Sequence, residues 1–292
     1  MTAPVRVGLA GSGPWARMVH APLLAAGPET ELVGVWSRSP EHAAALAAEH
    51  NVVSFASFDA LLDAVDAVAL AVVPAAQPDL AVRAANAGKA LLLEKPLSVD
   101  VDGARRIADA VAVNRVGSLM LLTYRFADVV RDFLAEAATM QPTGGRACFI
   151  SGAFLGGAFA GGWRLELGAL LDVGPHILDL VEAALGPVVE IQGHGDPRAW
   201  VGLLLTHENG ACSEVTLSCA SAIEPSRTEV EVYGREKSLF VDARSGTRAE
   251  SFARVGAEFA QVARSGAPHP CDAARGLVLQ ELIARAERAL LA

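Results

Sequence analysis

A lysine that follows an apolar run is the first residue in this chain whose type and place suggest chemistry. The stretch KALLLEKPLSV (89–99) places Glu94, Lys95 and Pro96 directly after four apolar residues. A plain strand end is one explanation, because charges meet solvent there and proline stops a β-ladder. The alternative is that the ammonium group of Lys95 is directed at a ligand, and the surrounding sequence decides between the two.

A glycine-rich turn follows the first apolar run of the chain. The segment GLAGSGPWA contains Gly11-x-Gly13-x-x-Ala16, a variant of the dinucleotide-binding fingerprint. Gly11 permits a tight turn, Gly13 lets a pyrophosphate approach the backbone, and Ala16 allows a helix to pack closely on a strand. Pro14 and Trp15 lie at the start of the following helix, whose N-terminus offers free N–H groups to phosphates. The pattern predicts a dinucleotide site.

The tip of the second apolar run favours NADP over NAD. An acidic residue at this place would accept hydrogen bonds from the 2′-hydroxyl of the NAD ribose. The sequence here is VWSRSPE, with Ser37 and Arg38 and no acid at the tip. A guanidinium group offers several donors to phosphate oxygens, so the pair suits a 2′-phosphate. Arg38 stacked on adenine or turned to solvent is the alternative.

Short apolar runs and helix-like segments alternate over the first 125 residues. The apolar runs cover residues 5–11, 31–37, 51–55, 67–73, 90–94 and 117–124, and the helical segments cover 14–26, 40–50, 57–64, 77–87 and 100–114. Continuous apolar strands that alternate with helices indicate a parallel sheet covered on both faces. Such a sheet brings the turn after the first run and the EKP segment after the fifth run to one edge, where Lys95 would face the nicotinamide.

After residue 125 the pattern changes to strand, turn and strand. Asn209-Gly210 separates two apolar runs and predicts a β-hairpin. We therefore expect an α/β chain with an N-terminal Rossmann doubly wound parallel sheet over residues 1–124. An α+β domain with a mostly antiparallel sheet would occupy residues 125–292, and its C-terminal helix would be able to pack back on the first domain.

Several segments together resemble the Gfo/Idh/MocA family of nicotinamide-dependent oxidoreductases. They are GSGPWARMVHAPLL (11–24), NAGKALLLEKPLSVD (86–100), YRF (124–126) and GALLDVGPHILDLVEAALG (168–186). The resemblance covers most of the chain, and EKP combined with a downstream D-x-G-x-H is its most specific part. Pro175 lies within the second motif, so the helix there must begin late or kink.

The resemblance implies a catalytic set of Lys95, Asp172 and His176. Histidine is the natural acid or base near neutral pH, and Lys95 would stabilise oxyanion charge or relay a proton. Asp172 would orient His176, with which it shares a face if both lie on one helix, or bind a substrate hydroxyl. The alternative for His176 is a buried structural pair with Asp172 or Asp179. The remaining cofactor-binding residues expected are Val73, Pro74, Glu94 and Lys95 itself, with Glu94 positioning the loop.

Four further residues are expected to line the substrate pocket. They are Tyr124, Arg125, Trp163 and Arg164, although the last two could equally serve packing between domains. The resemblance implies an NAD(P)-dependent oxidoreductase that acts on a secondary alcohol or carbonyl of a sugar, polyol or related small molecule. A catalytically silent cofactor-binding sensor and a reductase of diketones or dihydrodiols are the alternatives.

The composition narrows the choice of partners. The formal net charge is −9, which disfavours nucleic acid or an anionic membrane as a partner. The four cysteines form no CxxC pair and no metal-ligand spacing, so reduced thiols and no metal site are expected. No signal-peptide pattern and no bilayer-length apolar run is present, so we expect a cytoplasmic protein. The resemblance adds a homodimer or higher homo-oligomer.

Overall fold

The computed structural model describes residues 3–157, 160–246 and 248–291. The chain forms two compact units, neither of which is continuous in sequence. The first takes the residues up to Leu121 together with Phe252–Val278, and the second takes Leu122–Ser251 together with the residues from Leu279 onward. The functional boundary expected after residue 124 stays a prediction.

The first unit is built on a six-stranded parallel sheet. Its strands are β1 (Val5–Ala10), β2 (Thr30–Trp36), β3 (Val53–Ser54), β4 (Ala67–Leu70), β5 (Ala90–Leu93) and β6 (Ser118–Met120). They lie in the order β3-β2-β1-β4-β5-β6, and each neighbouring pair is parallel. This is the order of a doubly wound dinucleotide-binding sheet, so the expected Rossmann fold is confirmed.

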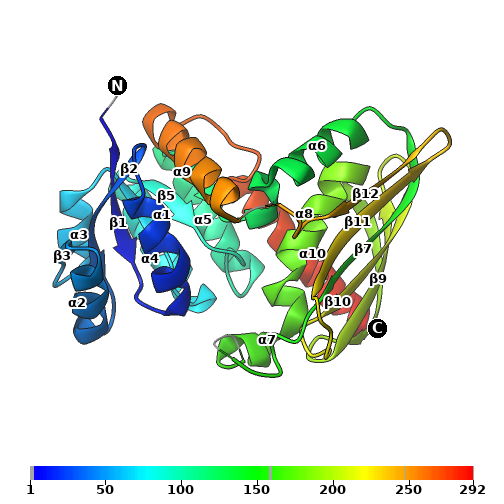
Figure 1. Cartoon of the computed structure of the whole chain (residues 1–292), viewed down its shortest axis with the longest axis horizontal. Coiled ribbons are helices and arrows are strands. Elements are labelled where there is room, and N and C mark those ends of the chain that lie inside the picture. Colours follow the sequence, from blue (N-terminus) through cyan, green and yellow to red (C-terminus); the bar gives the residue numbers. More distant parts are fainter. Residues whose placement is uncertain (1–2, 158–159, 247, 292) are drawn as a thin grey trace. The chain divides into compact units, whose positions relative to one another are not determined.

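Helices connect these strands, and three of them begin at a capping side chain. They are α1 (Ala21–Ala25), α2 (Pro40–Glu49), α3 (Phe58–Ala64), α4 (Gln77–Asn86) and α5 (Val101–Asn114) (Figure 1). Ser39, Ser57 and Asp100 accept a backbone N–H in the first turn of α2, α3 and α5, as N-cap residues do. Every residue of β4 and β5 is buried, which requires cover on both faces of the sheet.

The second unit contains a six-stranded mixed sheet. Its strands are β7 (Pro142–Ile150), β8 (Val188–Asp196), β9 (Trp200–His207), β10 (Cys212–Ser218), β11 (Arg227–Gly234) and β12 (Ser238–Asp242). In the order β12-β11-β7-β10-β9-β8, β7 and β10 are parallel and the other neighbours are antiparallel. The mostly antiparallel sheet is confirmed, and the Asn209-Gly210 turn joins β9 to β10 as predicted.

One face of this sheet is packed and the other is open. Val201, Leu203 and Leu205 of β9 are buried, whereas Trp200 and Leu204 are exposed, which is the alternation of a sheet covered on one side. Figure 1 shows α8 (Gly174–Leu185) along the packed face. The other helices are α6 (Asp128–Ala137), α7 (Trp163–Asp172), α9 (Arg248–Ser265) and α10 (Ala273–Leu291).

The structure refines two predicted helical segments. The late start expected of the helix around Pro175 is confirmed, because α7 ends at Asp172 and α8 begins at Gly174, with Pro175 in its first turn. Proline lacks an N–H and fits only the first turn of a helix, so the late start has a direct cause. The segment expected as a helix over 14–26 contains a five-residue π-helix, Ala16–His20, before α1. No helix in the described part of the chain has an apolar stretch that would cross a bilayer.

Candidate active site

The turn after β1 can be made only by glycine at its first position. Gly11 has φ +124°, and a Cβ built on it would lie 2.1 Å from the carbonyl oxygen of Ala71, just past β4. Gly13 is different, because nothing lies within 4 Å of its added Cβ and the residue is exposed. Protein atoms therefore fill the space beside Gly11, whereas the space beside Gly13 is open to a ligand.

The helical segment after this turn starts without a side-chain cap from any described residue. Trp15 precedes the π-helix and no side chain in the described part of the chain caps its start. Ala16 is fully buried, as expected for close packing of the helix on the sheet. A glycine turn followed by an uncapped helical start is the arrangement that receives a pyrophosphate, so these residues fit a dinucleotide.

Ser37 and Arg38 lie at the carboxyl end of β2. Ser12 Oγ donates to Ser37 Oγ at 2.9 Å, and Ser37 Oγ donates to the carbonyl of Ser39 at 2.7 Å. These bonds join the glycine turn to the tip of β2. Arg38 is exposed and makes no ion pair with another described residue, so its guanidinium group is accessible to an anion.

Val73 and Pro74 lie at the carboxyl edge of the same sheet, after β4. Val73 is 39% exposed and Pro74 is buried at the start of a short 3₁₀-helix, Pro74–Ala76. Both therefore stand on the edge that carries the glycine turn, with Val73 presenting an apolar surface to solvent. Their contact with a cofactor stays a prediction.

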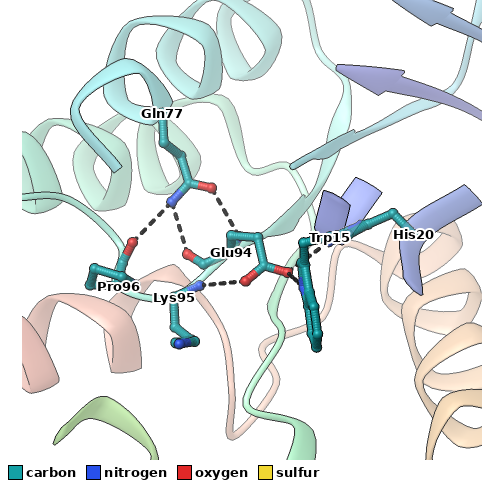
Figure 2. Close-up of polar contacts among 6 residues, drawn as sticks. All are labelled: Trp15, His20, Gln77, Glu94, Lys95 and Pro96. Carbon is teal, nitrogen blue, oxygen red and sulfur yellow. Dashed lines mark hydrogen bonds and ion pairs between the residues drawn. The ribbon is translucent and has the colours of Figure 1, made fainter. Parts of the chain in front are cut away.

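The EKP segment after β5 is held by a side chain from α4. Gln77 is fully buried, and its Oε1 accepts the N–H of Glu94 at 2.9 Å. Its Nε2 donates to the carbonyls of Glu94 at 2.8 Å and Leu97 at 3.0 Å, with Pro96 at 3.4 Å (Figure 2). Lys95 is partly exposed within this fixed loop.

The Glu94 carboxylate connects this loop to the π-helix. Trp15 Nε1 donates to Glu94 Oε1 at 2.7 Å, and His20 Nε2 lies 2.7 Å from the same oxygen. Sequence reasoning missed His20 and Gln77. The available signals were a histidine in the first helical segment and a glutamine that follows the fourth strand, but neither signal identifies a partner.

In the second unit, His176 is buried against the aromatic ring of Tyr124. It is 8% exposed, in the first turn of α8, and the ring of Tyr124 meets it edge-on at a centroid distance of 5.3 Å. Tyr124 belongs to a 3₁₀-helix, Thr123–Phe126, and its hydroxyl lies 3.4 Å from Oγ1 of Thr228. An imidazole enclosed in this way has its ring plane restricted by its neighbours.

Two arginines of the second unit pair with buried aspartates. Arg125 Nη1 donates to both carboxylate oxygens of Asp179, at 3.3 and 3.2 Å, and the Asp179 side chain is 1% exposed. Arg164 Nε lies 3.6 Å from Asp172 Oδ1, and its guanidinium group covers the ring of Trp163 at 4.5 Å. The four residues expected to line a substrate pocket are thus ordered by contacts inside this unit.

The three predicted catalytic residues fall into two units. Lys95 belongs to the first unit, whereas Asp172 and His176 belong to the second. The expectation that Asp172 and His176 share one helix face is wrong, because the helix is interrupted at Val173 and the two residues stand on α7 and α8. The cause is again Pro175, which fixes the start of α8 just before His176.

Two family descriptions match the sequence. Residues 5–120 match "Oxidoreductase family, NAD-binding Rossmann fold", and residues 145–240 match "GFO/IDH/MocA C-terminal domain". They describe the N-terminal and C-terminal parts of one family and follow each other in the expected order. Together they span more than two thirds of the chain.

Curated proteins give similarity over shorter segments. The dTDP-3,4-didehydro-2,6-dideoxy-alpha-D-glucose 3-reductase of Streptomyces violaceoruber is 32% identical over 196 residues, which is 65% of this chain and 57% of that protein. The UDP-N-acetylglucosamine 3-dehydrogenase of Acidithiobacillus ferrooxidans is 38% identical over 100 residues, 34% of this chain and 31% of the relative. The matched segments span less than two thirds of the length of these relatives.

Solved structures resemble the fold over nearly the whole chain. The UDP-N-acetylglucosamine 3-dehydrogenase of Acidithiobacillus ferrooxidans has a TM-score of 0.87 at 21% identity and covers 99% of this chain and 98% of its own. GenD2 from gentamicin A biosynthesis, solved in complex with NAD, has a TM-score of 0.87 at 22% identity, with 100% and 95% covered. The family matches and the fold agree, and the chain belongs to the Gfo/Idh/MocA family of oxidoreductases with an NAD-binding Rossmann fold.

Proposed function

We propose that this chain is an NAD(P)-dependent oxidoreductase that acts on a secondary alcohol or carbonyl of a sugar, polyol or related small molecule. One observation carries the proposal: the first unit joins an open glycine turn to a fixed Lys95 loop through the Glu94 carboxylate. The relatives that act at position 3 of dTDP- and UDP-linked sugars support a sugar as the substrate.

In this proposal the cofactor supplies or accepts the hydride, and the protein handles the proton. His176 takes the hydroxyl proton as the alcohol is oxidised, or returns it when a carbonyl is reduced. Lys95 stabilises the developing charge on the substrate oxygen, and Asp172 orients His176. Tyr124 packs edge-on against His176 and limits the rotation of its ring.

The glycine turn gives a first test of the cofactor site. Gly13→Ala adds a methyl group that meets no protein atom, so we expect wild-type thermal stability. The methyl group would occupy the space of the pyrophosphate, so the NADPH affinity should fall at least about tenfold. Gly11→Ala is the contrasting variant and should lose stability as well, because its Cβ meets the Ala71 carbonyl. NADPH titration and thermal melting measure both effects. Unchanged affinity in Gly13→Ala would contradict the site.

We propose that NADP is preferred over NAD, on account of Ser37 and Arg38. Titration followed by cofactor fluorescence should show tighter binding of NADPH than of NADH. Arg38→Ala should weaken NADPH binding about tenfold and leave NADH unchanged, because a charge-assisted hydrogen bond to the 2′-phosphate is lost. Arg106→Ala, which removes an exposed arginine paired with Asp79, is the matched control. Equal binding of both cofactors, or tighter binding of NADH, would contradict the proposed preference for NADP.

Turnover is tested with a panel of UDP-N-acetylglucosamine, dTDP-linked sugars and myo-inositol, each with both cofactors. We expect oxidation of at least one member, and we expect Lys95→Met and His176→Asn to lower kcat by about 10²-fold or more, because charge stabilisation and proton transfer are removed. Both variants should still fold and bind NADPH. A protein that binds NADPH and turns over nothing in a broad carbonyl and alcohol panel would be a sensor instead.

We also propose a homo-oligomer that associates through the open face of the second unit's sheet. Leu204 is 44% exposed and Phe240 61% exposed on this face. Light scattering at micromolar concentration should give a multiple of the 30.3 kDa chain mass. Leu204→Glu should shift the mass toward the monomer, because a charge would be buried at the contact. A wild-type monomer at this concentration would reject the proposal.

A further inference from the structure

We propose that Glu94 is a positioning residue that holds the phosphate-binding turn and the Lys95 loop in one arrangement, through hydrogen bonds from Trp15 and His20. The inference deepens the proposed function and rests on it, since it concerns the same cofactor site. All four residues belong to the first unit. Figure 2 shows Glu94 between Gln77 on one side and the Trp15 and His20 side chains on the other.

The Glu94 carboxylate is used on both of its oxygens. Oε1 receives Trp15 Nε1–H at 2.7 Å and lies 2.7 Å from His20 Nε2, while Oε2 accepts the N–H of Lys95 at 3.2 Å. An ionised carboxylate only accepts hydrogen bonds, so both ring nitrogens donate to it. With Glu94 only 8% exposed, these bonds replace hydration that burial has removed.

His20 serves this carboxylate and has no route to act as an acid or base toward a ligand. Its side chain is fully buried, and no described residue forms a hydrogen bond with its Nδ1. A proton on Nδ1 would be a buried donor with no acceptor, whereas the tautomer protonated only on Nε2 leaves a lone pair there. His20 therefore donates from Nε2 to Glu94.

Two of the three bonds join segments that are far apart in the sequence. Trp15 lies 79 residues from Glu94, and His20 lies 74 residues from it. Trp15 precedes the π-helix that follows the glycine turn, His20 is the last residue of that helix, and Lys95 is the next residue after Glu94. Gln77 holds the same loop from α4, through the N–H and carbonyl of Glu94. A shift of the glycine turn thus moves Glu94 or breaks its bonds.

The variant Glu94→Gln distinguishes a positioning role of Glu94 from a role in fold stability alone. The glutamine amide has one acceptor oxygen where the carboxylate has two, so Glu94→Gln can serve either the Trp15 and His20 donors or the Lys95 N–H. A residue that merely braces the fold would change the melting temperature alone. A positioning residue must also change the ligand affinity and the surroundings of the Lys95 amine.

The experiment measures NADPH affinity by fluorescence titration and the reactivity of Lys95 by trace acetylation with acetic anhydride followed by mass spectrometry. The chain has three lysines, so Lys89 and Lys237 are internal references for labelling. Glu94→Gln should weaken NADPH binding about tenfold, the value of one hydrogen bond to a charged group. It should also change the labelling of Lys95 relative to Lys237. Glu29→Gln, at an exposed ion pair with Arg264, is the matched control and should change neither.

The His20 pair of variants keeps the test decisive if Glu94→Gln fails to fold. His20→Gln places an amide N–H near the position of Nε2 and should resemble the wild type. His20→Leu fills the volume without a donor and should show the losses expected of Glu94→Gln. Affinity within about twofold of wild type and unchanged Lys95 labelling in folded Glu94→Gln or His20→Leu would overturn the inference. A wild-type protein that binds neither NADPH nor NADH would overturn the proposed function itself.

Discussion

The chemistry of the first unit depends on one constraint, the close approach of two strand ends at the edge of a parallel sheet. When both faces of a sheet are buried, only the ends of its strands are accessible to a ligand. In a parallel sheet the carboxyl ends of all strands lie on the same edge. At the reversal of strand order, the turn after β1 comes so close to Ala71 that only glycine fits at position 11. The packing of the sheet thus requires glycine at position 11, and the open space at Gly13 belongs to the same turn.

A loop at that edge must still satisfy its own backbone. An N–H or carbonyl group that is buried without a partner costs about 1–3 kcal/mol. The EKP loop has no strand neighbour to supply partners, and the side chains of Gln77 and Glu94 supply them instead. Lys95 is therefore ordered because its loop must satisfy its backbone hydrogen bonds. Two polar side chains are buried for this purpose, Gln77 at 0% and Glu94 at 8% exposure.

The sequence revealed what depends on local spacing and missed what depends on distant partners. Apolar runs and the Asn209-Gly210 turn are local signals, and the structure bears them out. Pro175 is also a local signal, and it correctly predicted the late start of α8. The partners of Glu94 lie 74 and 79 residues away, and no pattern in a single sequence joins them. The roles of the predicted site residues stay predictions.

The second unit uses buried carboxylates in a related way, but with charged partners. Asp179 is almost fully enclosed and meets Arg125 through both of its oxygens. Such a pair adds little net stability, because desolvation offsets its attraction, yet loss of one partner strands a buried charge. Its effect is on geometry: it fixes the 3₁₀-helix that carries Tyr124, and Tyr124 in turn restricts the ring of His176. In both units, then, a carboxylate with no chemical step in the proposed reaction helps to position a residue that has one: Lys95 in the first unit and His176 in the second.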